Sequence, residues 1–420
     1  MRLTTATLCL ALLATASCSH GSNRQEGTAG PASTDLAERG RALAKRFIIA
    51  DGHIDVPYRL QEKLGPDGEP TEDVSQRTDQ GDFDYPRAVE GGLDVAFMSI
   101  YIPAELQAKP GASKALADSL IDMVEKIARQ SPEKFAMAHS VEQSRRNTQE
   151  GKISFALGIE NGSAIEDKLE NVAHFHQRGV RYITLTHSKD NLLSDASFNS
   201  GKRTWNGLSP FGRQVVAEMN RVGIMVDVSH LSDDAIRQAV EVSQTPVIAS
   251  HSSCRHFTPG FERNISDELI RVVAAKGGVV MINFGSDFLS QAANAYGLQV
   301  RNALQTFADQ RGLKDREHPE VKAFLESYLR EHPPRYAKVE DVADHIDHVV
   351  KLVGIDHVGL GSDFDGVGPT LPIGLKDVSQ YPNLFRVLLE RGYSEADIEK
   401  IASGNVFRVW QRVEAHASGR

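Results

Sequence analysis

Imidazole and carboxylate side chains recur along this chain directly after short apolar segments. His53 and Asp55 follow the first such segment, and their spacing puts both side chains on one face of extended backbone, as two ligands of one metal ion require. Taken singly, such residues have ordinary explanations: Glu160 could hydrogen-bond a glycine-rich turn, and His230 could cap a helix. Each residue of the set lies directly after a short apolar segment, and this shared placement outweighs the separate explanations. The full set is His53, Asp55, Glu160, His187, His230, His251 and Asp363.

Imidazole and carboxylate ligands suit zinc or a similar divalent ion. Five candidate ligands exceed what one catalytic zinc normally uses, so we predict two zinc ions that share the Glu160 carboxylate. Water held between two such ions ionises near neutral pH and can attack a carbonyl, which makes hydrolysis the expected reaction. The predicted ligand pairs are His53 with Asp55 on one ion, and His230 with His251 on the other.

Two residues of the set remain for proton transfer and charge stabilisation. Asp363 is the expected proton shuttle, because a carboxylate beside the metals can take a proton from the water and pass it to the departing amine. His187 is not assigned to metal and can donate a hydrogen bond to the developing oxyanion.

The elements that must position these residues form a repeating pattern. Eight short, β-branched segments alternate with amphipathic stretches, which indicates the α/β class and favours a closed (β/α)8 TIM barrel. In such a barrel the carboxyl ends of the strands converge on one mouth, where the chemistry resides. The predicted strands are Phe47–Ala50, Val95–Tyr101, Ile153–Ile159, Tyr182–Thr186, Ile224–Ser229, Val247–Ser250, Val279–Phe284 and Val358–Ser362, and the predicted helices include Lys114–Arg129, Phe211–Val222, Asp233–Val242 and Asp267–Lys276.

A long insertion is predicted from Ser286 to Asp344, between the seventh and eighth strands. It is read equally well as a lid, a subunit contact or a surface decoration. The histidines away from strand ends are predicted to be structural, with His256 undecided because it lies closer to the mouth. The structural set is His174, His176, His345, His348 and His357.

The N-terminal residues predict export. Arg2 precedes an apolar run that ends in small residues and Cys18, which is typical of a signal peptide over residues 1–17. The pattern favours a lipidated Cys18 over plain cleavage without lipidation, although Thr15 stands where such a pattern usually has Leu. Residues 18–35 read as a disordered tether and 36–420 as the metallohydrolase domain. We therefore expect the protein in a bacterial cell envelope, lipid-anchored at the periplasmic side and touching the membrane only through that anchor.

Composition excludes other classes. The chain has 420 residues and a formal net charge of −9, without a basic stripe, so a nucleic-acid partner is not expected. After removal of the signal peptide only Cys18 and Cys254 remain, which leaves no disulfide framework. Cys254 is interpreted as an inert small residue.

The combined motifs closely resemble the membrane dipeptidase (renal dipeptidase-like) family of zinc metallopeptidases, in its bacterial lipoprotein form. The similarity extends from about His53 to Asn405 and matches order and spacing as well as single motifs. Two departures occur near the expected pocket: Gly285 replaces a Tyr of mammalian relatives, and Asn161 stands where Gly is frequent. The matching segments are DGHID (51–55), GIENG (158–162), RYITLTH (181–187), GLSPFG (207–212), VDVSH (226–230), SHSS (250–253), RNISDE (263–268) and GSDFDGV (361–367).

The resemblance implies a (β/α)8 barrel of the metal-dependent amidohydrolase type that hydrolyses dipeptides with two zinc ions bridged by Glu160. It implies the ligands named above, roles for His187 and Asp363 at the substrate, and a new residue, Arg263, that pairs with the substrate's terminal carboxylate. Acceptance of D-residues at the C-terminal position stays open, as does a homodimer.

Two other functions remain as alternatives. The nearer is another binuclear amidohydrolase that acts on a cyclic amide, a lactone or a phosphoester, since only the pocket would differ. The position of Arg263 separates the two: facing the metals favours a dipeptide, and facing solvent favours the alternative. A non-catalytic envelope binding protein would be expected to have lost ligands, and every expected ligand is present here.

Overall fold

The computed structural model describes residues 31–198, 201–313 and 318–419. The predicted signal peptide and Cys18 lie outside the described residues. Helix α1 (Pro31–Arg46) packs against α14 (Tyr381–Glu390), so the C-terminal part of the predicted tether belongs to a docked helix instead. Among the described residues, no helix has both the length and the apolar character needed to cross a membrane.

A closed parallel barrel forms the centre of the molecule. Eight strands follow one another around it, and the pairing of β2 with β4 closes the ring. The sequence predicted these eight, and the structure confirms the TIM-barrel fold. Strand β3 is additional and pairs with the start of β4. The strands are β1 (Ile49–Ile54), β2 (Leu93–Tyr101), β3 (Phe135–Met137), β4 (Ile153–Glu160), β5 (Val180–Thr184), β6 (Met225–Asp227), β7 (Ile248–Ala249), β8 (Val279–Ile282) and β9 (Val358–Leu360).

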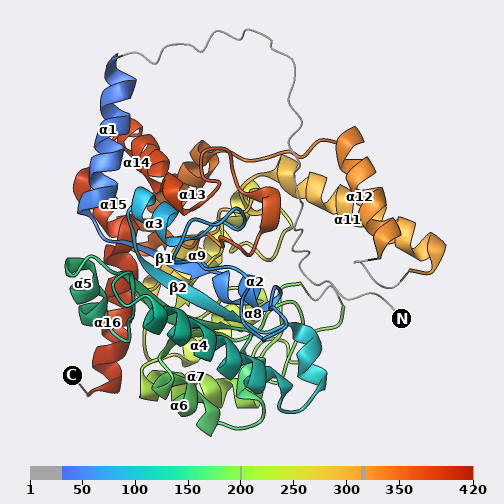
Figure 1. Cartoon of the computed structure of the whole chain (residues 1–420). Helices are drawn as coiled ribbons and strands as arrows, with labels where there is room; N and C mark the ends of the chain where they lie inside the picture. Colours follow the sequence, from blue (N-terminus) through green and yellow to red (C-terminus); the bar gives the residue numbers. More distant parts are fainter. Residues whose placement is uncertain (1–30, 199–200, 314–317, 420) are drawn as a thin grey trace.

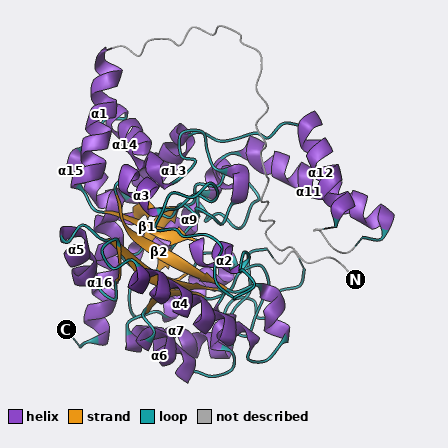
Figure 2. Cartoon of the chain, in the orientation of Figure 1, coloured by secondary structure: helices purple, strands orange, loops and turns teal. Residues whose placement is uncertain are grey.

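Helices surround the barrel on its outside (Figure 2). Several begin where the sequence places a capping serine: Ser209, Ser232 and Ser266 each accept a hydrogen bond from a backbone N–H in the first helical turn. Besides α1, α14 and the helices of the insertion described below, the α-helices are α2 (Val56–Gln61), α3 (Tyr85–Gly91), α4 (Ala112–Gln130), α5 (Val141–Gln149), α6 (Glu170–Gln177), α7 (Pro210–Val222), α8 (Asp233–Val242), α9 (Asp267–Ala275), α13 (Val339–Val353), α15 (Glu395–Glu399) and α16 (Asn405–Ala417).

The barrel interior is filled by side chains rather than open. Inward-facing residues such as Phe97, Tyr182 and Met281 form a buried cluster with residues of α16. The Trp410 ring of that helix lies 5.2 Å from the Phe97 ring, centroid to centroid. This packing fixes the strands whose opposite ends carry the predicted site residues.

The predicted insertion between the last two barrel strands is present and helical. It contains α10 (Ser286–Leu289), α11 (Gln291–Arg311) and α12 (Pro319–Glu331), and the last two extend away from the barrel (Figure 1). Stacking of Phe307 on Phe324, with ring centroids 4.2 Å apart, joins these two helices. The end of the predicted insertion overlaps α13, which packs against α9 and α14 as a regular barrel helix.

The first strand differs from its predicted bounds. It was expected to end at Ala50, but it continues to Ile54. The buried Asp51 carboxylate explains this: it accepts hydrogen bonds from the backbone N–H groups of His53 and Ser362 and from the Tyr381 hydroxyl. His53 therefore lies inside the strand.

Candidate metal centre

The ends of the strands hold the predicted residues at one mouth of the barrel. Glu160 is the last residue of β4, and His251 follows β7 at a distance of two positions. His230 and Asp363 come shortly after β6 and β9, and both have left-handed backbone, with φ of 67° and 63°. Non-glycine residues rarely adopt that conformation, so their side chains are aimed by a costly local geometry.

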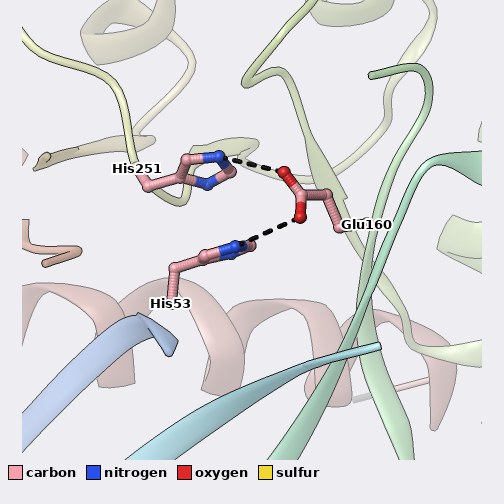
Figure 3. Close-up of side chains that lie close together, drawn as sticks. All are labelled: His53, Glu160 and His251. Atoms are coloured by element: carbon pink, nitrogen blue, oxygen red, sulfur yellow. Dashed lines mark ion pairs between the residues drawn. The ribbon is translucent and has the colours of Figure 1, made fainter. Parts of the chain in front are cut away.

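Glu160 lies at the centre of the cluster, and its two oxygens face different histidines (Figure 3). Its Oε2 atom is 3.4 Å from the Nε2 atom of His53. Its Oε1 atom is 2.9 Å from Nε2 of His230, 3.4 Å from Nε2 of His251 and 3.5 Å from Nε2 of His187. All of these side chains are buried. One carboxylate therefore joins two sets of ring nitrogens.

Two further carboxylates lie beside His53. Its Nε2 atom is 3.3 Å from Oδ2 of Asp55, and a potential ligand group contains His53, Asp55 and Asp363. The Nδ2 amide of Asn283 donates a hydrogen bond to Asp363, with a length of 2.6 Å. Burial, followed by the nearby Asp55 carboxylate, raises the pKa of Asp363 well above its ordinary value.

Hydrogen bonds on the far side of two rings orient them toward the cluster. The Nδ1 atom of His53 is 2.8 Å from the Tyr182 hydroxyl, and Nδ1 of His251 is 2.7 Å from the Ser250 hydroxyl. Ser250 in turn donates to the buried Asp227 carboxylate. With Nδ1 occupied in this way, each Nε2 atom presents its lone pair to the centre, as in metal-bound histidines.

The electrostatics match a cation site. Burial alone would raise the pKa of Glu160, but the surrounding histidines, His53 and His187 first, hold it well below its ordinary value. Burial, followed by the charge of Arg263, lowers the pKa of His230 far enough to keep that imidazole neutral. Neutral imidazoles and ionised carboxylates are the forms that bind metal.

The ring nitrogens of the cluster also fit a metal ion, because their lone pairs are buried close to one another. The Nε2 atom of His53 is buried and makes no hydrogen bond to a described residue, although two carboxylates lie nearby. The Nε2 atoms of His230 and His251 are 2.8 Å apart, so two basic nitrogens converge on one point. A divalent cation would satisfy these lone pairs.

Arg263 lies against this cluster and is 3% exposed. Its Nη1 donates to the Ser252 hydroxyl, and its Nη2 donates to the His251 carbonyl at 2.9 Å. Nη2 also lies 3.0 Å from Nε2 of His230. The buried Nε atom has no hydrogen-bond partner among the described residues. Arg263 thus lies against the centre and not in solvent, and one of its donor atoms makes no hydrogen bond to a described residue.

Three half-buried aromatic residues, which sequence reasoning missed, lie beside Arg263 and His230. Phe198 is 6.0 Å from the His230 ring and 6.1 Å from Phe261, and Phe261 is 5.5 Å from Phe288, all between ring centroids. The Arg263 guanidinium lies over the Phe288 ring at 5.2 Å. We call Phe198, Phe261 and Phe288 the aromatic collar. They stand in loops and in α10, where no periodic pattern marks them.

The two departures near the pocket have clear geometry. Asn161 has φ of 81°, the left-handed region that favours glycine, and its amide Nδ2 donates to the Ile102 carbonyl. A Cβ atom on Gly285 would lie 2.9 Å from the Phe288 ring. The position of Phe288 therefore depends on the missing side chain at 285.

The other histidines lie away from the centre. His345 is buried and accepts the Cys254 backbone N–H, and His357 contacts the Gly278 carbonyl. His174 pairs with Asp118. His256 lies beside His348. Cys254 itself is buried, and burial raises the pKa of its thiol, which agrees with an inert role.

The chain is similar to known proteins along most of its length. A family model described as "Membrane dipeptidase (Peptidase family M19)" matches residues 37–420. "Dipeptidase tcpJ" of Claviceps purpurea is 32% identical over 385 residues, which cover 88% of this chain and 78% of that protein.

Two solved structures extend the comparison. The probable dipeptidase PvdM from Pseudomonas aeruginosa has a TM-score of 0.77 and 28% identity, covering 91% of this chain and 100% of that one. A metallo peptidase from Rhodobacter sphaeroides, liganded with a phosphinate mimic of the dipeptide L-Ala-D-Ala, has a TM-score of 0.70 and 25% identity, covering 87% and 99%.

Proposed function

This chain belongs to the membrane dipeptidase family, peptidase family M19, and is a metallo-dipeptidase; on that premise we propose that its centre holds two zinc ions bridged by Glu160. The two oxygens of Glu160 carry the proposal, because Oε2 faces His53 while Oε1 faces His230 and His251. Asp55 would complete the His53 side. When bound, two zinc ions ionise a water near neutral pH and polarise a peptide carbonyl.

Asp363 is the residue we assign to proton transfer. Burial and the neighbouring Asp55 raise its pKa, so it takes up a proton readily at the cluster. The Asn283 amide holds one carboxylate oxygen, Oδ2, by a hydrogen bond. A carboxylate restrained in this way can accept a proton from the nucleophilic water and pass it to the leaving amine of the dipeptide.

His187 is assigned to the carbonyl oxygen of the substrate. Burial lowers the pKa of this imidazole, which keeps it neutral and able to donate from a protonated ring nitrogen. Its ring packs edge-on against Tyr101, with centroids 4.8 Å apart, and this contact limits rotation. A fixed donor beside the metals stabilises charge that develops on the oxygen.

Arg263 is assigned to the terminal carboxylate of the dipeptide. Its burial, its position against His230 and its unpartnered Nε atom all support a charge-assisted pairing with a small anionic ligand. The aromatic collar would then receive the side chain of the C-terminal residue, so apolar side chains are expected there. This geometry favours a dipeptide over the cyclic amide, lactone or phosphoester of the alternative function.

The stereochemistry of the C-terminal residue belongs to the same proposal. The Rhodobacter sphaeroides relative binds a mimic of L-Ala-D-Ala, and we propose that this chain also accepts D-residues at that position. Matched L,L and L,D dipeptides with the same side chains test it directly. Turnover of the L,L forms alone would overturn this part and leave the dipeptidase assignment intact.

Metal content and turnover, measured on the same purified protein, test the core of the proposal. About two zinc ions per chain and chelator-sensitive dipeptide turnover are expected. Asp363→Asn should retain the metals and lose at least about 100-fold in kcat, since general acid–base catalysis contributes about that much. Metal binding without dipeptide turnover would move the substrate to the alternative class, and absence of metal after zinc reconstitution would overturn the centre.

Localisation and assembly are proposed from the sequence. We expect cleavage after residue 17 and a lipid on Cys18 that anchors the enzyme in the cell envelope. Mass spectrometry of the mature N-terminus tests this, and Cys18→Ser should release the protein from the membrane fraction. Light scattering of the released form measures whether it is the homodimer that the family resemblance suggested.

A further inference from the structure

A second cluster of metal-binding side chains lies outside the centre. His256, Asp267 and His348 come from three separate elements: the short 3-10 helix Arg255–Phe257, the first position of α9, and α13. One ligand atom from each lies within 4.8 Å of the other two. The three residues have no part in the proposed catalytic mechanism.

Part of the cluster is already assembled. The Nε2 atom of His348 is 2.8 Å from Oδ1 of Asp267, and the His256 and His348 rings stack with centroids 4.3 Å apart. His256 is exposed, whereas the His348 side chain is 13% exposed. Two of the side chains therefore form a supported pair, and the third can turn toward them from solvent.

We propose that His256, Asp267 and His348 form a peripheral site for a borderline divalent metal ion such as Zn²⁺, Ni²⁺ or Cu²⁺. Two imidazoles and one carboxylate are the donors that these ions prefer, and they are too few and too nitrogen-rich for Ca²⁺ or Mg²⁺. Metal–ligand bonds of about 2.0–2.2 Å require the ligand atoms to approach within about 4 Å, which a small rotation of His256 supplies.

The place of this site in the fold gives it a consequence for the substrate. His256 and Asp267 lie on either side of Arg263 in sequence: His256 stands in the connection from β7 to α9, which also contains His251, and Asp267 is the first residue of α9. His348 belongs to α13, which packs against α9. A metal bound here ties both ends of the segment that carries Arg263 to one rigid helix.

Metal binding at the peripheral site does not depend on the dipeptidase mechanism. Its effect on substrate does rest on the proposed role of Arg263: a restrained segment should lower KM for dipeptides and leave kcat nearly unchanged, because Arg263 contacts no reacting atom. The metal stoichiometry therefore tests the peripheral site, and KM separately tests its effect on the substrate.

The experiment titrates Cu²⁺ at neutral pH into enzyme that holds two zinc ions per chain, so that the peripheral site is empty at the start, and follows binding by electron paramagnetic resonance. His256→Gln and His348→Gln remove one ligand each. His174→Gln is the matched control, because His174 is another histidine near the surface that pairs with an aspartate, Asp118, at 2.8 Å. Among the described residues, His174 belongs to no group of three potential ligands. Circular dichroism confirms the fold of each variant.

Wild type and the His174 variant should bind one equivalent of Cu²⁺ with a nitrogen signature, at least tenfold more tightly than the His256 and His348 variants. Dipeptide turnover of the zinc-loaded variants before copper addition should equal that of wild type. Equal copper binding by all four proteins would overturn the peripheral site. Copper binding that leaves KM unchanged would overturn only its effect on the Arg263 segment.

Discussion

Replacing Arg263 by lysine isolates the pairing with the substrate carboxylate. Lysine keeps the positive charge but has no rigid fork of donors. In the structure the fork is already held by Ser252 and the His251 carbonyl, and Nε remains without a partner. Hydrogen bonds to charged groups contribute about 1.5–3 kcal/mol each, so loss of one should cost about that much. That corresponds to a fall of about 10- to 140-fold in kcat/KM.

The assay compares a dipeptide with its C-terminal amide, which lacks the carboxylate. Wild type should discriminate strongly against the amide, and Arg263→Lys should lose most of that discrimination because only the acid substrate is affected. Arg255→Lys is the matched control: Arg255 lies on the same connection and holds Asp233 through two hydrogen bonds of 2.8 and 2.6 Å. An equal loss on acid and amide would refute the carboxylate role.

Three further changes test other parts of the structure. Tyr182→Phe removes the hydroxyl beside Nδ1 of His53. Zinc affinity, measured by competition with a chelator, should fall by about 10- to 100-fold, because hydrogen-bond partners of ligating histidines have effects of that size. An unchanged affinity would show that the His53 ring does not need this hydrogen bond. Phe288→Ala should lower the ratio of kcat/KM for a dipeptide with C-terminal Phe to that for one with C-terminal Gly by about 2- to 12-fold, because one aromatic contact is lost. An unaltered ratio would place the substrate side chain elsewhere. Burial raises the pKa of Asp94 in the folded state from 3.8 to about 6. The folded state therefore binds a proton more tightly than the unfolded state, which adds about 2–3 kcal/mol to the free energy of unfolding below pH 4. This contribution is lost as the pH rises through 6. Asp94→Asn retains an acceptor for the Ile49 N–H and should remove that decline from urea unfolding between pH 4 and pH 6.5, whereas parallel curves would assign the pH dependence to other groups.

The barrel and the centre could be predicted from the sequence because both follow one local rule. Buried strands are legible as β-branched runs, and closure of the barrel brings their carboxyl ends together whatever the loops do. His187 and His251 could therefore be grouped although neither is near the other in sequence. All the residues predicted for the site do lie in one cluster or against it.

What could not be predicted depends on contacts between distant loops. Arg263 was found through the family resemblance alone, because its approach to His230 follows from the path of a connection with no periodic pattern. The aromatic collar was missed for the same reason. Asn283 resembles an ordinary strand residue, and only the three-dimensional structure brings its amide to Asp363. Strand β3 is too short to be recognised by alternation.

Backbone conformation shows how the fold maintains the centre. Six non-glycine residues in the described part of the chain have a positive φ. Four of them stand at the barrel mouth: Asn161, His230, Asp363 and Asp365. Each such residue costs about 1–3 kcal/mol and persists only where its surroundings hold it.

For the turn that carries Asp363, the supporting contacts are visible. Asp365 and Asp82 each accept the backbone N–H of the other, at 2.6 and 2.8 Å, and the Arg59 guanidinium lies 3.2 Å from Asp365. Burial, followed by the charge of Asp365, raises the pKa of Asp82 well above its ordinary value, and protonation of Asp82 relieves the repulsion between the two carboxylates. The contacts come from the loop of Asp82, about 280 positions away in sequence, and from Arg59 of α2, and they restrain the strained turn from which Asp363 reaches the centre.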